Sequence, residues 1–317
     1  MTSTIATENL TKDYNGARGI RDVTLAIAEG EIFGFLGPNG AGKTTTIRVL
    51  MGMLHPTSGS AHIFGFDCWS QATAVKRLVG YLPGEFSFDP GLTGAQILTY
   101  LGNLRGGVDK QYLRQLIERL ELDPSKRFRE YSRGNKQKVG LVQAFMHRPR
   151  LLVLDEPTGG LDPLNQQTFY DLVKETHAAG ATFFLSSHIL PEVEHICQRV
   201  GIIREGQLVT VDQVSALKDL RQHIVEITFP IPVAPEDFAT LPGVREVQAT
   251  NDGLGLLLTV TGDLRDILQA AARHEATNLV SHEPSLEEVF LRFYAPDEAA
   301  TGAGVRPHSA PPSPIPS

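Results

Sequence analysis

Up to about residue 218, hydrophobic positions follow two patterns that alternate along the chain. Short, continuous apolar runs occur at residues 31–36, 151–154 and 182–185, and such runs are typical of strands that are buried on both faces. Between them, apolar residues recur every three or four positions, as at 111–120, which is typical of helices. Alternating strands and helices predict an α/β fold with a mostly parallel central sheet.

Two smaller parts are expected beside this central sheet. Residues 89–147 have mainly the helical pattern and are predicted to form a helical subdomain inserted into the sheet domain. Residues 6–14, 22–27 and 60–64 resemble short strands of a separate antiparallel sheet near the N-terminus. Together these elements predict one domain over residues 1–218.

A different order of elements begins after residue 218. The pattern is strand, short helix, strand, strand, helix, strand, over 224–229, 236–241, 244–249, 254–260, 264–274 and 277–281. This β-α-β-β-α-β order predicts a small ferredoxin-like α+β unit, so residues 219–295 are expected to form an accessory domain. A last helix is predicted from Ser285, where Glu288 completes a capping box. The proline-rich residues 296–317 are expected to be a disordered tail.

Composition excludes several classes of protein. The 317 residues carry a net charge of −7, which argues against a generally basic nucleic-acid-binding protein, so no nucleic-acid partner is expected. The longest apolar stretches fall far short of the ~20 residues that cross a bilayer, and the polar N-terminus lacks the apolar core of a secretory signal. The two cysteines, Cys68 and Cys197, lack metal-ligand spacing and are expected to be buried or idle thiols in a reducing cytosol.

Residues 37–44 carry the first chemical motif. They satisfy the pattern G-x-x-x-x-G-K-[ST] directly after an apolar strand and directly before a helix-like stretch, which is the context that this phosphate-binding motif requires. The glycines let backbone N–H groups converge on phosphate oxygens, and the following helix points its positive end at the same place. Lys43 adds a full positive charge, and Thr44 is predicted to hold Mg²⁺ through its hydroxyl. The residues predicted to bind the phosphates are Gly37, Pro38, Asn39, Gly40, Ala41, Gly42, Lys43, Thr44 and Thr45.

Two acids, Asp155 and Glu156, follow the apolar run 151–154. On their own, acids after a strand are more often a helix cap or part of a solvated loop. Beside a phosphate loop, however, the first acid can hold Mg²⁺ through its water shell, and the second can orient or deprotonate an attacking water. We therefore predict Asp155 as a metal ligand and Glu156 as the residue that activates water.

With these motifs in place, residues 4–215 resemble the ATP-binding subunits of ABC transporters. Besides the phosphate loop and the acid pair, further motifs occur in the order of that family: a signature at Ser132-Arg133-Gly134-Asn135, a D-loop at Gly160-Leu161-Asp162, a switch histidine at His188 and an adenine-stacking aromatic residue at Tyr14. The resemblance implies a P-loop NTPase fold and an ATPase that uses ATP and Mg²⁺.

The resemblance also implies how these parts work together. Two such domains would lie head to tail, and each ATP would be held by the phosphate loop of one domain and the signature of the other. Lys43, Glu156 and His188 are the implied catalytic residues, of which His188 would hold the γ-phosphate. The further ATP contacts implied by the family motifs are Tyr14, Ser132, Gly134, Asn135 and Asp162. A homodimer, or a heterodimer with a close homologue, follows from this arrangement.

Three positions depart from the family pattern, and one of them is Asn135, a shorter amide in place of the final glutamine of the signature, which can still donate a hydrogen bond. Arg133 replaces the first glycine of the signature, where it would either add bulk and charge beside the nucleotide or point into solvent. Gly84, after Tyr81-Leu82-Pro83, stands where the family has the glutamine of its Q-loop. Because glycine has no side chain that could reach Mg²⁺ or water, two alternatives are open: Glu85 takes the place of that glutamine in the metal shell, which is the residue we assign, or the contact is missing.

The segments around Gly84 and Arg133 and the ending at 283–290 look like those of type-two exporter ATPases, similar to bacterial drug and antibiotic-resistance exporters. This resemblance implies a subunit on the cytoplasmic face of the membrane that docks on a separately encoded permease through the helical subdomain and powers export of a drug, antibiotic, lipid or similar substrate. Two alternatives stay open: a soluble ABC-type regulatory ATPase that moves no substrate, and a module that closes on ATP but barely hydrolyses it. Such regulators usually carry two ATP-binding domains in one chain, whereas this sequence has one phosphate loop.

Overall fold

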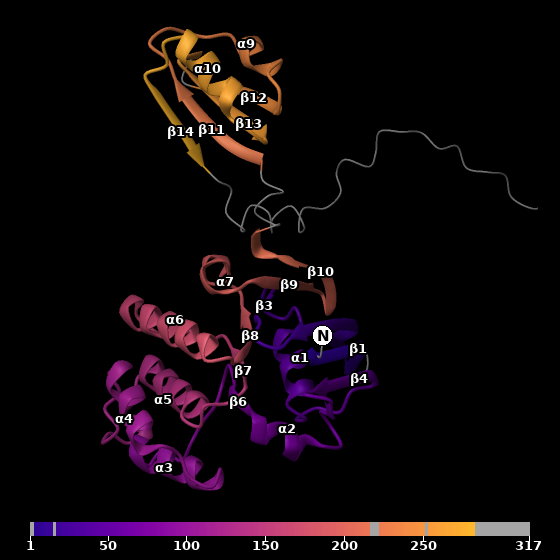
Figure 1. Cartoon of the computed structure of the whole chain (residues 1–317), viewed down its shortest axis with the longest axis vertical. Coiled ribbons are helices and arrows are strands. Elements are labelled where there is room, and N and C mark those ends of the chain that lie inside the picture. The colour runs from indigo at the N-terminus through magenta and orange to yellow at the C-terminus, as the bar shows by residue number, and fades with distance from the viewer. Residues whose placement is uncertain (1–2, 15–16, 216–221, 251–252, 283–317) are drawn as a thin grey trace, which may run out of the picture. The chain divides into compact units, whose positions relative to one another are not determined.

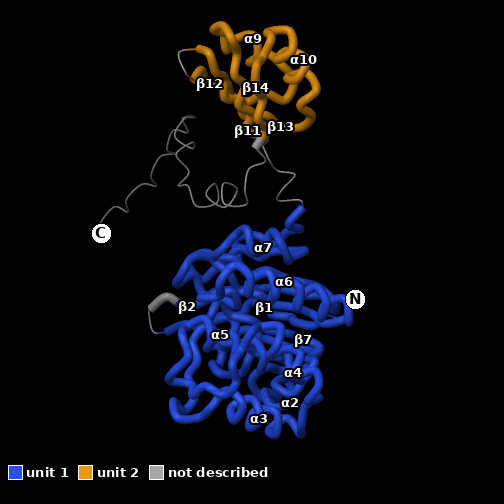
Figure 2. The backbone as a smooth tube through the Cα atoms, turned by 90° about the vertical axis from the view of Figure 1, so that its left-hand side faces the viewer, with its two compact units in different colours: residues 1–220 blue, residues 221–317 orange. Residues whose placement is uncertain are grey.

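The chain divides into two compact units, residues 1–220 and residues 221–317, and each is described by itself (Figure 2). The computed structural model describes residues 3–14, 17–215, 222–250 and 253–282. The helix predicted from Ser285 and the tail predicted over 296–317 lie outside the described residues.

A six-stranded sheet forms the centre of unit 1, in the order β10-β9-β3-β8-β7-β6 (Figure 1). Its strands are β3 (Ile32–Leu36), β6 (Val79–Leu82), β7 (Leu151–Asp155), β8 (Thr182–Ser187), β9 (Arg199–Arg204) and β10 (Gln207–Gln213). All neighbouring pairs are parallel except β10 with β9. Every residue of β3, β7 and β8 is buried, which explains their continuous apolar runs. The mostly parallel central sheet predicted from the sequence is present.

A second sheet, antiparallel and in the order β2-β1-β4-β5, packs against the first. Its strands are β1 (Ser3–Tyr14), β2 (Ala17–Ala28), β4 (Ser58–Ile63) and β5 (Phe66–Asp67). One apolar cluster joins the two sheets, and its members include Ile5, Leu10, Ile27, Phe33, Phe35 and Phe184. This shared core fixes the antiparallel sheet relative to β3.

Helices cover the rest of the central sheet. Outside the helical subdomain, the helices whose full bounds are described include α1 (Lys43–Leu50), α2 (Ala72–Leu78), α6 (Pro163–Ala178) and α7 (Leu190–Ile196). The predicted helical subdomain lies between β6 and β7 and contains α3 (Gly94–Leu104), α4 (Lys110–Arg119), a short 3-10 helix (Phe128–Glu130) and α5 (Arg133–Phe145). In Figure 1, α3, α4 and α5 group on one side of the central sheet, and β1 and β4 lie on the other.

The described residues of unit 2 form a four-stranded antiparallel sheet with two helices, in the strand order β12-β13-β11-β14. Along the chain the elements are β11 (Gln222–Thr228), α9 (Glu236–Ala239), β12 (Val244–Thr250), β13 (Gly255–Thr261), α10 (Arg265–Arg273) and β14 (Asn278–His282). This is the β-α-β-β-α-β order that the sequence predicts. Unit 2 has a core of its own, which includes Phe229, Phe238, Leu256, Leu258 and Ile267.

Both cysteines are buried free thiols, as predicted. Burial raises the pKa of the Cys68 thiol to about 12 and also raises the pKa of the Cys197 thiol, so neither is a reactive thiolate at neutral pH. Across the part of the chain that the structure describes, the helices are too short or too polar to cross a membrane.

Candidate nucleotide-binding site

The loop of residues 37–42 joins the carboxyl end of β3 to the start of α1. Gly40 and Gly42 have φ angles of 80° and 111°, in a left-handed region that residues with a Cβ rarely adopt. The Gly42 carbonyl accepts a hydrogen bond from the Thr46 N–H at 2.9 Å, so α1 starts directly at the loop. The first N–H groups of a helix have no partner within the helix, and the loop therefore ends on an anion-binding helix terminus.

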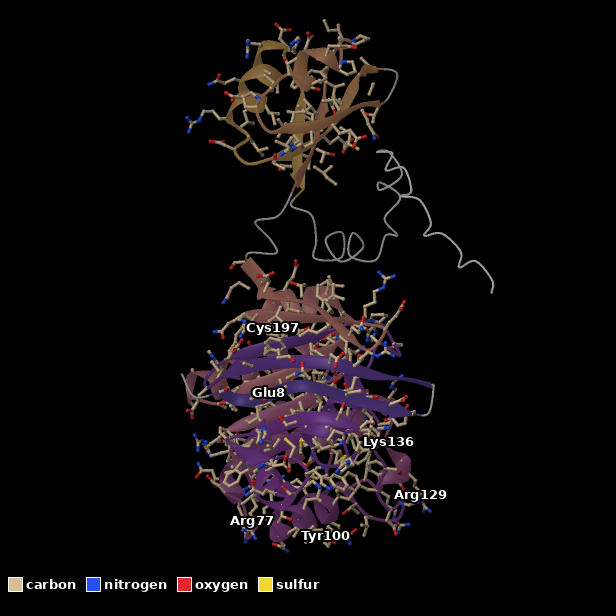
Figure 3. The ribbon with its side chains drawn as sticks, turned by 90° about the vertical axis from the view of Figure 1, so that its right-hand side faces the viewer. Glu8, Arg77, Tyr100, Arg129, Lys136 and Cys197 are labelled. Carbon is tan, nitrogen blue, oxygen red and sulfur yellow. The ribbon has the colours of Figure 1, made fainter. Side chains whose placement is uncertain are left out.

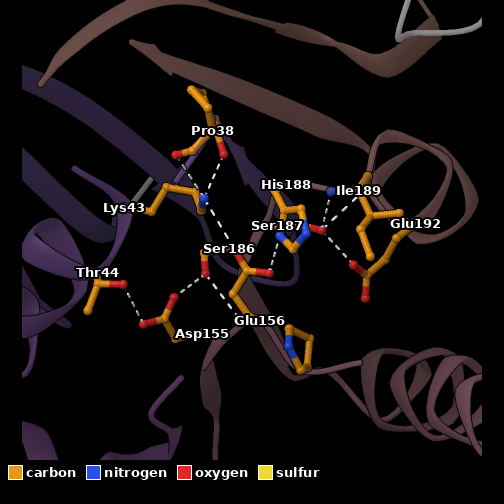
Figure 4. Close-up of polar contacts among 12 residues, drawn as sticks. Pro38, Lys43, Thr44, Asp155, Glu156, Ser186, Ser187, His188, Ile189 and Glu192 are labelled. Carbon is orange, nitrogen blue, oxygen red and sulfur yellow. Dashed lines mark hydrogen bonds and ion pairs between the residues drawn. The ribbon is translucent and has the colours of Figure 1, made fainter. Parts of the chain in front are cut away.

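Lys43 brings a buried positive charge to this loop, since its side chain is only 5% exposed. Its ammonium group donates hydrogen bonds to the carbonyl oxygens of Gly37 (2.5 Å) and Pro38 (3.2 Å). It also forms an ion pair with Glu156, with 3.2 Å between Nζ and Oε1 (Figure 4). The phosphate loop and the acid pair, which are far apart in the sequence, therefore meet at Lys43.

Thr44 and Asp155 form the second contact between these motifs. The Thr44 hydroxyl donates to Asp155 Oδ2 at 2.9 Å, and the Ser186 hydroxyl donates to Asp155 Oδ1 at 2.5 Å. Oxygen ligands suit Mg²⁺, which is usually bound by one or two protein side chains together with substrate phosphates and water. No group of three or more His, Cys, Asp or Glu side chains gathers as a metal cluster within the described ranges. The Thr44 hydroxyl and the Asp155 carboxylate, whose oxygens lie 2.9 Å apart, fit a Mg²⁺ ion that is bound by few side chains.

Glu156, the second acid, directs its carboxylate between Lys43 and His188. Its Oε2 lies 2.5 Å from His188 Nδ1. Its backbone has a φ of 53°, a left-handed conformation that is uncommon for a residue with a Cβ. The Glu156 N–H donates to the carbonyl and the hydroxyl oxygen of Ser186, each at 3.2 Å. The end of β8 thus helps to hold Glu156 at the end of β7.

The contact between Ser187 and Glu192 holds the loop that carries His188. The Ser187 hydroxyl donates to Glu192 Oε2 at 2.6 Å and accepts from the Ile189 N–H at 2.9 Å (Figure 4). Glu192 is 5% exposed, and burial raises the pKa of its carboxyl group, whereas the hydrogen bond from Ser187 opposes that rise. The neighbours of His188 in the chain, Ser187 and Ile189, are therefore both held by the Ser187 hydroxyl, which also contacts Glu192 on α7.

Lys43, Thr44, Asp155, Glu156 and His188 line one cavity of about 1200 Å³. Of the residues predicted from the sequence, the lining includes Pro38, Asn39, Gly40, Gly42, Lys43, Thr44, Thr45, Glu85, Asp155, Glu156 and His188. Glu85 is exposed, and the preceding Gly84 runs directly past Asp155, because a Cβ at Gly84 would lie 3.1 Å from Asp155 Oδ2. The cavity thus combines a phosphate loop, carboxylates and an imidazole.

Other predicted residues lie outside the described lining of this cavity. Ser132 is the N-cap of α5 and accepts a hydrogen bond from the Asn135 N–H at 3.3 Å, and Asp162 is the N-cap of α6. Gly134 packs against the carbonyl of Gly160 so closely that a Cβ would collide with it. The structure thus places the predicted signature at a helix start, without bringing Ser132 or Asp162 to the phosphate loop of the same chain.

The structure places Arg133 at the cavity and Tyr14 outside its lining. Tyr14 is 39% exposed, lies 5.6 Å from the Lys12 ammonium measured to the ring centre, and is outside the cavity lining. Arg133, whose direction the sequence left open, lines the cavity. Its alkyl chain lies over Gly160, where a Cβ would meet Arg133 Cγ at 3.2 Å.

Two residues of the site were not singled out from the sequence. Gln137, on α5, donates hydrogen bonds to the backbone of Glu156 and Pro157, and Ser186 contacts both Asp155 and Glu156. Ser186 stands at a predicted strand end beside His188, which is a usable signal. Gln137 lies between two lysines in a helix, and nothing in that local pattern predicts its partners.

Comparison with known proteins identifies the family. Residues 20–159 match the family described as ABC transporter, and residues 214–294 match the C-terminal domain of DrrA1-3-like ATP-binding proteins. The bacitracin transport ATP-binding protein BcrA of Enterococcus faecalis is 39% identical over 225 residues, which cover 70% of this chain and 73% of BcrA. This chain belongs to the ATP-binding subunits of ABC transporters.

Two further likenesses support this assignment of the ABC subunit. The linearmycin resistance ATP-binding protein LnrL of Bacillus subtilis (strain 168) is 30% identical over 306 residues, 90% of this chain and 96% of LnrL. A solved structure of an ATP-binding subunit of an ABC transporter is 28% identical, with a TM-score of 0.63 over 69% of this chain and 93% of that one. The predicted family and fold class are confirmed, and the ABC subunit is a nucleotide-binding ATPase of a transporter.

Proposed function

We propose that the cavity at the carboxyl ends of β3, β7 and β8 is where this ABC subunit binds and hydrolyses ATP. The observation that carries the proposal is the contact of Lys43 with Glu156, and of Glu156 with His188, in one cavity. Residues 37–45 bind the phosphates, and Lys43 neutralises part of their charge. Glu156 positions the attacking water and accepts its proton, while His188 donates a hydrogen bond to the γ-phosphate.

Thr44 and Asp155 are proposed to hold Mg²⁺ with the bound nucleotide. Their oxygens already lie 2.9 Å apart, at the start of α1 and the end of β7. When bound, Mg²⁺ would neutralise charge on the β- and γ-phosphates. Glu85 is proposed as a further member of the metal shell, because it lines the same cavity and follows the glycine that contacts Asp155.

Two copies of the subunit, or one copy and a close homologue, are proposed to bind ATP between them. Ser132, Gly134, Asn135 and Asp162 would complete the site of the partner, as the head-to-tail arrangement implied by the family motifs requires. The N-terminus of α5 suits this role, because free N–H groups at a helix start attract a phosphate. Tyr14 is proposed to stack on the adenine ring.

A membrane permease is proposed to dock on the helical subdomain and to place the subunit at the cytoplasmic face of the membrane. Tyr100 and Leu104, one turn apart on α3, are 61% and 67% exposed. Figure 3 places Tyr100 and Arg77 at the same end of unit 1. Exposed apolar side chains that adjoin one another are typical of protein interfaces.

The proposed reaction powers export of an antibiotic, drug or similar substrate. Relatives named for bacitracin transport and linearmycin resistance support this substrate class. Residues 1–218 are proposed as the ATPase domain and residues 219–295 as an accessory domain, which the separate core of unit 2 supports.

Two substitutions test the proposed site by failing in different ways. Glu156→Gln should lower kcat by about 10² to 10⁴ while ATP still binds, because only the group that accepts the proton is changed. It should also accumulate an ATP-bound dimer. Lys43→Ala should instead weaken ATP binding, since a charge-assisted phosphate contact is worth roughly 1.5 to 3 kcal/mol. ATP turnover, equilibrium binding and gel filtration with Mg-ATP measure these effects, and normal turnover by the Glu156→Gln protein would overturn the proposal.

A further inference from the structure

Gln137 is a buried amide whose contacts the proposed reaction does not yet use. It lies on α5 and is 7% exposed. Its Nε2 donates hydrogen bonds to the carbonyl oxygens of Glu156 at 3.1 Å and Pro157 at 2.9 Å. The side chain of Gln137 therefore ends on the backbone of the residue proposed to activate water.

The backbone of Glu156 needs such support because its φ of 53° is unfavourable for a residue with a Cβ. Neighbouring groups hold it on both sides. Its carbonyl accepts from the Gly159 N–H at 3.2 Å as well as from Gln137, and its N–H donates to Ser186. Gly159 and Ser186 belong to the adjoining turn and to β8, whereas Gln137 reaches Glu156 from the helical subdomain.

The helix that carries Gln137 begins at the predicted signature. Ser132 is the N-cap of α5, and Gly134 in its first turn packs against the Gly160 carbonyl. The start of α5 is thus joined to residues 156–160 at two places, by a close backbone contact and by the Gln137 amide. The start of the signature helix and the backbone of Glu156 are therefore in direct contact.

We propose that Gln137 is a positioning residue that holds Glu156 in its reactive conformation and couples it to the signature helix. This inference rests on the proposed function, in which α5 contacts the ATP of the partner copy and Glu156 acts on the ATP of its own chain. Gln137 then links the two ATP sites of the dimer: closure of one signature on ATP sets the position of the water-activating carboxylate at the other site.

Gln137→Met tests this role, because methionine has nearly the length of glutamine but no N–H donor. We expect kcat to fall by about 10-fold to 100-fold, since small displacements of a catalytic group are costly. The KM for ATP should stay within about twofold, because no phosphate contact is changed. Gln143→Met is the matched control: the amide of Gln143 also donates from α5 to a backbone carbonyl, that of Tyr81. It should lower Tm to a similar extent and keep the kcat of the wild-type protein.

A double-mutant cycle separates positioning from a general loss of structure. In the Glu156→Gln background, adding Gln137→Met should cause no further fall in single-turnover hydrolysis, because Gln137 acts through Glu156. Three results would each overturn the inference. The first is that Gln137→Met lowers single-turnover hydrolysis as much in the Glu156→Gln background as in the wild-type protein. The others are a kcat of Gln137→Met close to that of the wild-type protein, and a kcat loss in Gln143→Met equal to that in Gln137→Met. Normal turnover by Glu156→Gln alone would instead contradict the proposed function, so the two failures are distinguishable.

Discussion

Lys43 shows how a charge is made acceptable inside this protein. A buried, unpaired ammonium group is costly, and here the loop carbonyls and the Glu156 carboxylate surround it. The same carboxylate also faces His188. Lys43, Glu156 and His188, which are proposed to act on the phosphates, therefore stabilise one another through these contacts. The contacts explain why the three side chains lie close together.

Glu85 gives the first prediction at the residue scale. If it takes the place of the missing Q-loop glutamine, Glu85→Ala should lower ATPase activity and raise the Mg²⁺ concentration needed for half-maximal activity, because a carboxylate is lost beside Asp155. Titration of turnover with Mg²⁺ measures both effects. Glu118→Ala, on α4, is a control in which neither quantity should change. Unchanged activity and unchanged Mg²⁺ dependence in Glu85→Ala would remove this residue from the metal shell.

At the scale of elements, the parallel order of the central strands creates the site. β3, β8 and β7 are consecutive neighbours in the sheet, and parallel strands end at the same edge. The phosphate loop follows β3, the acid pair ends β7, and His188 follows β8. Thr44 and Asp155, for example, are 111 residues apart in the sequence. These three polar segments meet because the strands that they follow are neighbours in the sheet.

Helix α3 gives the prediction at this scale. A charge at the two exposed apolar positions, in the double variant Tyr100→Asp and Leu104→Asp, should abolish binding to membranes that contain the permease, because burying an unpaired carboxylate is unfavourable. Turnover by the isolated subunit should not change. Val209→Asp on β10, also an exposed apolar position, serves as the control and should keep membrane binding. Sedimentation with vesicles, with and without the permease, measures binding, and retention of the double variant would exclude this docking surface.

For the whole molecule, the important fact is that, among the described residues, each unit has an apolar cluster of its own. The core of unit 1 joins its two sheets, and the core of unit 2 lies between its own sheet and helices. All the residues that line the proposed ATP cavity belong to unit 1. Nucleotide binding should therefore stabilise one unit and leave the other unchanged.

Calorimetry tests this prediction directly. We expect two thermal transitions, of which Mg-ATP raises only the one that belongs to unit 1. At a ligand concentration about 100 times Kd, the added stability should be roughly 2.7 kcal/mol. The Lys43→Ala protein should show the same two transitions with little or no shift. A single transition, or an equal shift of both, would mean that the two units unfold together.

The amino-acid sequence by itself determined the local features of this protein. The phosphate loop, the strand ends at Asp155 and His188, and the helix start at Ser132 were predicted because backbone propensity, glycine conformation and capping depend on neighbouring residues. Family membership and the element order of unit 2 were also predictable, since motifs and hydrophobic periods are properties of the linear chain. For the central sheet of unit 1, the sequence predicted β3, β7 and β8 but not β6, β9 and β10.

Only the tertiary structure decided which side chains complete the site. The contact of Gln137 with Glu156, the passage of Gly84 beside Asp155 and the course of Arg133 over Gly160 join segments that are distant in sequence. Such contacts depend on how the helical subdomain packs against the strand ends, and no local pattern encodes that packing. The same residues could have faced solvent in another arrangement of the same helices and strands.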